Sequence, residues 1–214
     1  MLVLAVDTST PAVTAGLVVL DDRGPHTVAS RITVDARLHA EVLTPHILEC
    51  LAETGHGPAD LSAVVVGTGP GPFTGLRVGM ATAAAFADAL HVPVHGVGSL
   101  DAIAAGVPGS RTLLVVTDAR RREVYWARFD GAERTSGPHV GAPSSVDTAG
   151  CAAVAGSPQH VDLFDLPVEP VESPSPRSLV LLAADALLHG VDPEPIAPQY
   201  LRRPDAVATA DRKR

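Results

Sequence analysis

Cysteines, aromatic residues and basic residues are all scarce in this sequence. Its 214 residues include two cysteines, Cys50 and Cys151, which exclude a disulfide framework and a four-thiolate metal site. Aromatic residues make up 3%, too few for the stacking platforms that hold single-stranded nucleic acids. The 16 Lys and Arg face 24 Asp and Glu, so a net charge of −8 repels phosphate backbones over most of the surface. The composition therefore argues against autonomous tight binding of RNA or DNA.

Long apolar runs and a basic leader segment are absent as well. No apolar run reaches the roughly 18 residues that a membrane-spanning helix requires. The apolar start of the chain carries no Lys or Arg and meets Asp7 after six residues, unlike a signal peptide. With 46% hydrophobic residues, the chain has ample material for a globular core. We therefore expect a cytoplasmic globular protein with no membrane association, built as one large domain or two small lobes.

Apolar runs and turn signals predict an α/β architecture in two lobes. The N-terminal lobe, residues 1–107, is expected to hold strands at 2–6, 13–20, 27–34, 63–66 and 92–97, and helices at 38–54, 75–90 and 99–105. Pro108, Gly109 and Ser110 mark the best boundary. The smaller C-terminal lobe, residues 108–214, is expected to hold strands at 112–117, 123–130 and 151–155 and a helix at 176–189 capped by Ser175. The proline-rich tail from Asp192 is expected to be an extended strap, packed back on the first lobe, or disordered.

The glycine-rich segment of residues 67–79 joins a buried strand to the start of a helix. Such a junction favours anions, because backbone amides and the helix dipole point outward there. The segment nevertheless lacks the Lys of a Walker loop and the spacing of a dinucleotide fingerprint, and Pro70 and Pro72 each remove an amide donor. A tight strand-to-helix turn is favoured over a phosphate-binding loop.

The helix that follows carries no charge between Val78 and Ala87. Its small residues Gly75, Gly79, Ala83 and Ala87 recur every four positions, which lets another backbone approach closely. A helix that is apolar on all sides must be covered on all sides. On this feature alone, the cover is equally well the same chain or a partner protein.

Asp7, Thr8 and Ser9 follow the first strand, where actin-like and sugar-kinase-like ATPases place a phosphate-contacting loop. An Asp there could hold hydrated Mg²⁺. Those ATPases also need a second, glycine-containing hairpin, but Asp118 is followed here by Ala119 and three arginines. Asp7, Thr8, Ser9 and Asp118 are thus candidates for a degenerate nucleotide loop, and a turn-capping carboxylate is the alternative for Asp7.

No catalytic or metal-binding set can be nominated from the sequence. His39, Ala40 and Glu41 mimic two metal signatures without completing either, and they are better explained as the start of a helix. The cluster of Arg120, Arg121 and Arg122 is either a solvated turn or a partner contact. The basic pairs of the tail, Arg202 with Arg203 and the final Arg212, Lys213 and Arg214, could add a weak, nonspecific RNA contact.

Several motifs together resemble the bacterial TsaB (YeaZ) family from end to end. They are Asp7-Thr8-Ser9, His39-Ala40-Glu41, Gly-Pro-Gly-Pro-Phe-Thr-Gly-Leu-Arg-Val-Gly at residues 69–79, Asp118-Ala119-Arg120-Arg121, and Pro198-Gln199-Tyr200-Leu201-Arg202. The glycine-proline segment is the most specific. The chain departs from the usual family pattern at Pro72 and Ala40, where Ser is more common.

The resemblance implies an actin-like ATPase, RNase H-like fold and a place in the complex that makes N6-threonylcarbamoyladenosine (t6A) in tRNA. It implies a non-catalytic scaffold, without cofactor or metal, that binds and activates the catalytic subunit TsaD, with TsaE as the ATPase subunit. TsaD carries an H-x-x-x-H metal pair that this chain lacks. Contact with tRNA would be indirect or weak. The alternatives are a nucleotide-dependent enzyme of the actin-like superfamily and a peptidase.

In the family, the two helices at 38–54 and 75–90 pack as a four-helix bundle against TsaD, or against a second TsaB copy in a homodimer. An Ala84→Glu change is therefore expected to abolish assembly. The candidate contacts in this chain are Leu38, Val42, His46, Arg77, Val78, Met80, Ala81 and Ala84.

Overall fold

Two β-sheets and the helices around them form the protein in a computed structural model, which describes residues 1–109 and 111–202. The first sheet has the strand order β3-β2-β1-β4-β5. Its strands are β1 (Leu2–Asp7), β2 (Ala12–Asp21), β3 (Gly24–Val34), β4 (Ala63–Gly67) and β5 (Val94–Val97). The first three are antiparallel neighbours, whereas β4 pairs in parallel with both β1 and β5. The predicted opening of three strands before any helix is confirmed.

The second sheet has the strand order β8-β7-β6-β9. Its strands are β6 (Thr112–Asp118), β7 (Val124–Asp130), β8 (Glu133–Gly141) and β9 (Ala153–Gly156). The strand β8 was not predicted from the sequence, because it is an edge strand with few apolar residues that contains Gly137 and Pro138 and shifts register against β7. We call the first sheet with its helices the first lobe, and the second sheet with its helices the second lobe.

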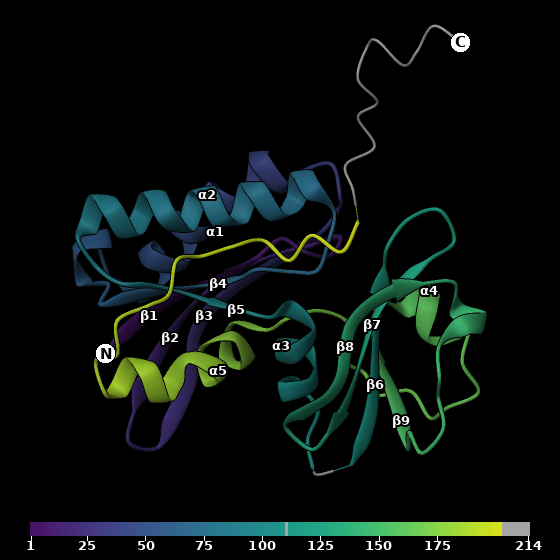
Figure 1. Ribbon diagram of the computed structural model, residues 1–214. Coiled ribbons are helices and arrows are strands. Elements are labelled where there is room, and N and C mark those ends of the chain that lie inside the picture. The colour runs from purple at the N-terminus through teal and green to yellow at the C-terminus, as the bar shows by residue number, and fades with distance from the viewer. Residues whose placement is uncertain (110, 203–214) are drawn as a thin grey trace, which may run out of the picture.

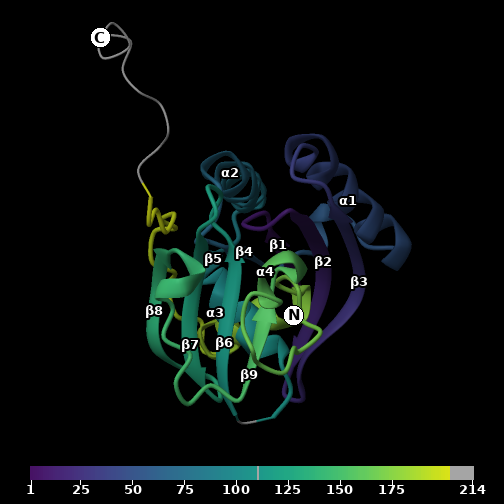
Figure 2. The ribbon, with the colours of Figure 1, turned by 90° about the vertical axis from the view of Figure 1, so that its right-hand side faces the viewer.

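Helices α1 (His39–Thr54) and α2 (Phe73–Leu90) cover one face of the first sheet, side by side (Figures 1 and 2). Their apolar stripes meet the inward face of β1, β2 and β4 around Leu4, Val64 and Ile47. The continuous apolar run of β4 is typical of a strand that is buried on both faces. The opposite faces of α1 and α2 point away from both sheets (Figure 2).

The helix α3 (Ser99–Gly106) packs on the second sheet on the side that faces the first lobe, and α4 (Pro158–Val161) lies on the outer face of that sheet. The helix α5 (Pro176–Leu188) covers the face of the first sheet opposite α1 and α2. α5 packs on the first sheet, although it follows the second sheet in the sequence. Ser175 caps α5 as expected, because its hydroxyl accepts the backbone N–H of Ser178 at 3.1 Å. The proposed division at residues 107 and 108 separates the two sheets, while α5 returns to the first lobe. Short 3-10 turns at Pro58–Asp60 and Pro143–Ser145 complete the chain.

The described segment after α5, residues 189–202, runs back across the first lobe as an extended strap, one of the alternatives that the sequence left open. The backbone N–H of Gln199 donates to the carbonyl oxygen of Thr68 at 2.9 Å, and Ile196 packs on the core under α2. At its end, Arg202 donates to the carbonyl oxygen of Ala119 at 2.7 Å in the second lobe. The strap therefore ties the two lobes together. Ser110, Arg203, Arg212, Lys213 and Arg214, singled out above, lie outside the described residues.

Among residues 1–109 and 111–202, no helix combines the length and the apolar character needed to cross a membrane. The same residues contain no group of three or more His, Cys, Asp or Glu side chains placed to hold a metal ion.

Candidate functional site

Asp7 ends β1 as a fully buried carboxylate that organises the turn after it. Its Oδ1 accepts the backbone N–H of Ser9 at 2.9 Å and the Ser9 hydroxyl at 2.8 Å, and its Oδ2 accepts the hydroxyl of Ser99 at 2.6 Å. Burial raises the pKa of Asp7, against the opposing effect of the hydrogen bonds from Ser99 and Ser9. A Cβ at Gly67 would overlap Oδ2, so a glycine is required beside the carboxylate. These contacts support the turn-capping interpretation of Asp7.

Thr8 fastens the same turn to α2. Its hydroxyl donates to the carbonyl oxygen of Gly75 at 2.7 Å and accepts the N–H of Gly79 at 3.0 Å. A Cβ at Gly75 or Gly79 would overlap atoms of Thr8, which explains why both positions are glycine. The row of small residues Gly75, Gly79, Ala83 and Ala87 is buried within the first lobe. Its close neighbour is therefore this chain, so the row itself does not indicate a partner.

Asp118 lies apart from these three residues, at the end of β6 in the second lobe. Its Oδ1 accepts the backbone N–H of Arg120 at 2.7 Å, and its carboxylate lies 3.6 Å from both Arg120 Nε and His160 Nε2. Asp118 lines the cleft between the lobes, whereas Asp7, Thr8 and Ser9 line neither of its two hollows. The structure therefore does not bring the four nucleotide-loop candidates together around one ligand.

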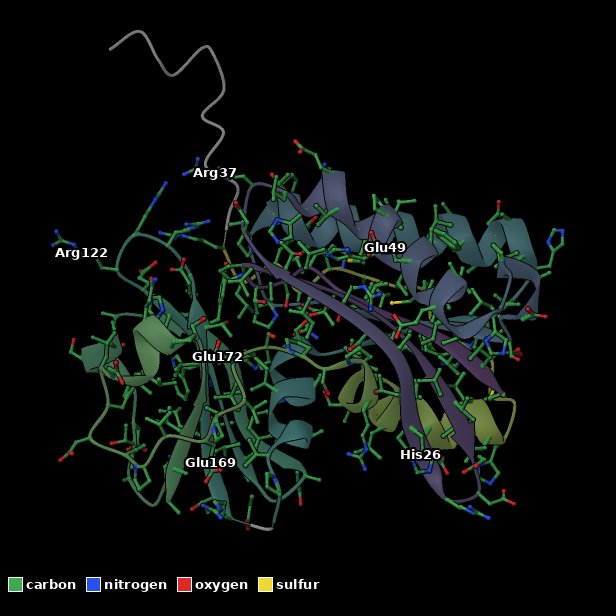
Figure 3. The ribbon with its side chains drawn as sticks, turned by 180° about the vertical axis from the view of Figure 1, so that it is seen from behind. His26, Arg37, Glu49, Arg122, Glu169 and Glu172 are labelled. Atoms are coloured by element: carbon green, nitrogen blue, oxygen red, sulfur yellow. The ribbon has the colours of Figure 1, made fainter. Side chains whose placement is uncertain are left out.

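Two adjoining hollows occupy the cleft between the lobes and share Thr10, Pro11 and Asp118. The smaller one, about 190 Å³, is also lined by Ser157, His160 and Glu172 of the second lobe, and Figure 3 labels Glu172. We call it the acidic hollow. The larger one, about 350 Å³, is lined by Arg37, His39 and Arg120, with the first residues of α1 and α2, and we call it the basic hollow. His160 and Glu172 were not identified from the sequence, because nothing in their spacing links them to Asp118.

The outer faces of α1 and α2 form the second candidate site. Two of the candidate contacts, Arg77 and Ala81, are exposed on α2. Leu38, Val42 and Val78 are half-buried, and the two valines pack against the core of the first lobe. Two further exposed residues were not among the predicted contacts: Ala85, one turn beyond Ala81, and Leu48 on α1, which is 50% exposed.

The remaining candidate contacts face other parts of the same chain. His46 turns toward β3, where its Nε2 lies 2.8 Å from the hydroxyl of Thr33. Met80 is only 8% exposed and belongs to the core. Ala84 is half-buried beside Val94 and Ile196, so an Ala84→Glu change would also disturb the strap. Ala81 and Ala85 are therefore better probes of an outer face than Ala84.

The strap shapes one border of this helical surface. Tyr200 stacks near Phe73, with ring centroids 5.1 Å apart, and its hydroxyl accepts a hydrogen bond from Arg77 Nε at 3.3 Å. The guanidinium of Arg77 lies 3.8 Å above the Phe73 ring, within the range of a cation–π contact. Arg77 is thus held by its own chain at the N-terminal end of α2.

Comparison with known proteins gives a consistent result. The model of the TsaD family, described as tRNA N6-adenosine threonylcarbamoyltransferase, matches residues 27–150. An uncharacterized protein of Mycobacterium leprae is 55% identical over 206 residues, covering 96% of this chain and 56% of that protein. The tRNA threonylcarbamoyladenosine biosynthesis protein TsaB of Escherichia coli is 35% identical over 136 residues, covering 62% of this chain and 57% of that protein. The chain thus matches little more than half the length of these two relatives.

Among solved structures, a Pseudomonas aeruginosa protein described as similar to peptidase YEAZ superposes with a TM-score of 0.77. It is 30% identical, and the match covers 94% of this chain and 99% of that one. Two mixed sheets flanked by helices, with a cleft between the lobes, define an actin-like, RNase H-like fold. Within that class, the chain belongs to the TsaB/YeaZ family.

Proposed function

We propose that this chain is the non-catalytic scaffold subunit of a t6A synthesis complex, which binds and activates a TsaD-type transferase through the outer faces of α1 and α2. Membership in the TsaB/YeaZ family supports a role in t6A biosynthesis. The observation that carries the docking role is the uncharged outer face of α2. Between Arg77 and Asp88, its exposed positions are alanines, Ala81 and Ala85.

Such a surface suits close helix packing. Small side chains let a second helix approach closely, and no charge has to be desolvated when the face of α2 between Arg77 and Asp88 is covered. On the neighbouring helix, the exposed side chain of Leu48 adds apolar area. In Figure 2, α1 and α2 lie side by side above the first sheet, and no other described helix or strand covers their outer faces.

The match to the TsaD family indicates why a transferase of that family is a suitable partner. The matched residues, 27–150, include the whole of α1 and α2, so members of that family have a corresponding segment. Two similar pairs of helices can pack as a four-helix bundle related by an approximate two-fold axis. The same geometry allows a homodimer of this chain when the transferase is absent.

The turn after β1 supports a non-catalytic role. The side chains of Asp7, Thr8 and Ser9 make hydrogen bonds within the first lobe and are at most 2% exposed. A nucleotide phosphate or its metal ion would have to replace those bonds. We therefore assign the chemistry to the transferase, ATP hydrolysis to a TsaE-type subunit in a ternary complex, and at most an indirect contact to tRNA.

Co-expression with the TsaD-type protein of the same genome tests this proposal. The double variant Ala81→Glu, Ala85→Glu places two charges on the outer face of α2, and we expect it to abolish co-purification and the transferase's t6A-forming activity. The matched control is Ala132→Glu, because Ala132 is exposed on the β7–β8 turn of the second lobe. Both variants should keep the circular dichroism spectrum of the parent. Co-purification of the double variant at the parental level would refute the proposed surface.

A further inference from the structure

A third hollow lies in the first lobe, outside the cleft between the lobes. The strap leaves the end of α5, passes β5 at the edge of the first sheet and then runs along α2 (Figure 1). Between the strap, α5 and β5 lies a hollow of about 400 Å³, which we call the strap hollow. None of its lining residues belongs to α1 or α2, and it shares none with either hollow of the cleft. Its lining is therefore independent of the two sites described above.

Prolines in the strap keep this space from being filled by a further strand. Pro193 and Pro195 have no backbone N–H, so this part of the strap cannot pair continuously with the edge of β5. Among the described hydrogen bonds, no backbone N–H of residues 192–198 donates to another backbone group. The strap returns to β5 at Ile196, whose Cγ2 lies 3.3 Å from the position of a Cβ on Gly96. The sequence of the strap thus builds the hollow into the fold.

His95 is a buried polar side chain in the wall of the strap hollow. It lies opposite Val65 of β4, which packs against α5, so its ring points to the same face of the sheet. The residue is 8% exposed and lines the hollow. Among the described residues, no hydrogen bond or ion pair involves its ring. Because buried polar side chains are nearly always hydrogen-bonded, an unpaired imidazole that lines a hollow points to a ligand there.

The ring of His95 offers a ligand one hydrogen-bond acceptor. Burial lowers the pKa of His95 below 6.5, so the imidazole is neutral at pH 7. A neutral imidazole carries a proton on one nitrogen and a lone pair on the other. The unprotonated nitrogen accepts a hydrogen bond, and a neutral ring does not repel a cation. A ligand with an N–H or O–H donor therefore suits this wall.

Two carboxylates of the strap give the hollow a negative charge. Asp192 and Glu194 line it, and both residues are exposed. Among the described residues, neither carboxylate forms an ion pair, and no Lys or Arg lines the hollow. Carboxylates without a cationic partner attract a positively charged ligand. A cation is therefore the donor that best suits both His95 and the strap.

The rest of the wall is apolar. It is formed by Leu182 and Ala186 of α5 and by Val191 and Ile196 of the strap. Leu182 and Val191 remain 38% and 54% exposed, so a bound hydrocarbon chain would remove apolar surface from water there. The hollow thus combines an acceptor, two negative charges and an apolar wall, and the ligand that matches this combination has a cationic donor group on a short aliphatic chain.

We propose that the strap hollow binds a small aliphatic amine in its ammonium form. The ammonium group donates a hydrogen bond to the unprotonated nitrogen of His95, and the carboxylates of Asp192 and Glu194 balance its charge. The hydrocarbon chain covers the apolar wall. A volume of about 400 Å³ is within the range of sites for small organic ligands. This site goes beyond the docking role, because it uses neither the outer faces of α1 and α2 nor the cleft.

Titration of the isolated full chain with n-butylamine at pH 7 and constant ionic strength, followed by amide NMR, tests the site. We expect saturable shifts at His95, Gly96, Val191 and Ile196. The variant His95→Leu should bind about tenfold more weakly, because it removes the accepting nitrogen from a charge-assisted hydrogen bond. Its midpoint of urea unfolding should not fall, since no hydrogen bond within the chain is lost. A lower midpoint with unchanged affinity would show that His95 is structural and would contradict the proposal.

The strap carboxylates provide an independent test on exposed residues. The double variant Asp192→Asn, Glu194→Gln should weaken binding about tenfold, because both charges that balance the ammonium group are removed. The matched control is Asp130→Asn, Glu133→Gln, which removes the same two charges from exposed positions on the β7–β8 turn of the second lobe. The control should bind like the parent, and equal affinity in the two double variants would overturn the proposal.

Titration with n-butanol separates the ammonium group from its hydrocarbon chain. Butanol has the same chain without the charge and should cause no saturable shifts, whereas binding as tight as that of n-butylamine would contradict the ammonium assignment. Amine shifts that do not saturate, or that spread over acidic residues outside the hollow, would equally count against the site. Loss of amine binding with intact transferase co-purification would leave the docking role standing, so the two proposals fail separately.

Discussion

The hydroxyl of Thr8 makes the contact on which the position of α2 depends most directly. A Thr8→Val variant keeps the shape of the side chain and removes its donation to Gly75 and its acceptance from Gly79. Each buried hydrogen bond contributes about 1 kcal/mol net, and leaving a buried partner without a replacement costs about 1–3 kcal/mol. We therefore expect the free energy of unfolding to fall by roughly 2–4 kcal/mol.

Urea unfolding followed by far-ultraviolet circular dichroism measures this loss, provided that the denaturant slope is unchanged. The control is Thr8→Ser, which keeps the hydroxyl and deletes one methyl group, for a loss of about 1 kcal/mol. If Thr8→Val were as stable as the parent to within about 0.5 kcal/mol, the hydrogen bonds of Thr8 would not stabilise the position of α2. A greater loss in Thr8→Ser than in Thr8→Val would contradict the reasoning equally.

Three further predictions concern Asp7, the strap and the thiols. Burial raises the pKa of Asp7 above 3.8, so its contribution to the free energy of unfolding is complete below about pH 3.8 and declines as pH rises through the folded pKa. The Asp7→Asn variant should lack this decline. Parallel pH profiles of urea unfolding for the parent and the variant would contradict this prediction. Tyr200→Ala removes the contact with Phe73 and the bond from Arg77, so the amide of Gln199 should exchange hydrogen faster, and unchanged exchange would show that Tyr200 does not anchor the strap. Burial raises the pKa of the Cys50 and Cys151 thiols, and Cys50 is fully buried. A thiol reagent at pH 7 should therefore react slowly and label Cys151 first. Earlier labelling of Cys50 would argue against the packing of α1.

The helices and strands could be predicted from the sequence better than their packing partners in the fold could. Continuous apolar runs identified β1 and β4, because a strand buried on both faces has no polar alternation to blur the signal. The strand β8 was not predicted, because an edge strand with a glycine and a proline resembles a loop in sequence. Nothing in the amphipathic pattern of α5 states which sheet it covers, and its return to the first lobe appears only in the fold.

In the candidate sites too, contacts between residues close in the sequence could be predicted, whereas contacts between distant residues could not. The sequence left two alternatives open for Asp7, a nucleotide loop and a turn cap, and its hydrogen-bond partner Ser99 lies 92 positions away. The four-residue row of glycines and alanines correctly indicated close backbone packing, yet spacing alone could not tell whether Thr8 or another protein was the neighbour. The cleft hollows draw on segments of both lobes, so no local pattern could predict them.

Hydrogen exchange of the chain with and without its TsaD-type partner tests the docking surface most directly. We expect slower exchange in peptides that cover α1 and α2, and no change in the β7–β8 hairpin of the second lobe. Protection confined to that hairpin or to α5, with α1 and α2 unchanged in a complex of confirmed mass, would contradict it.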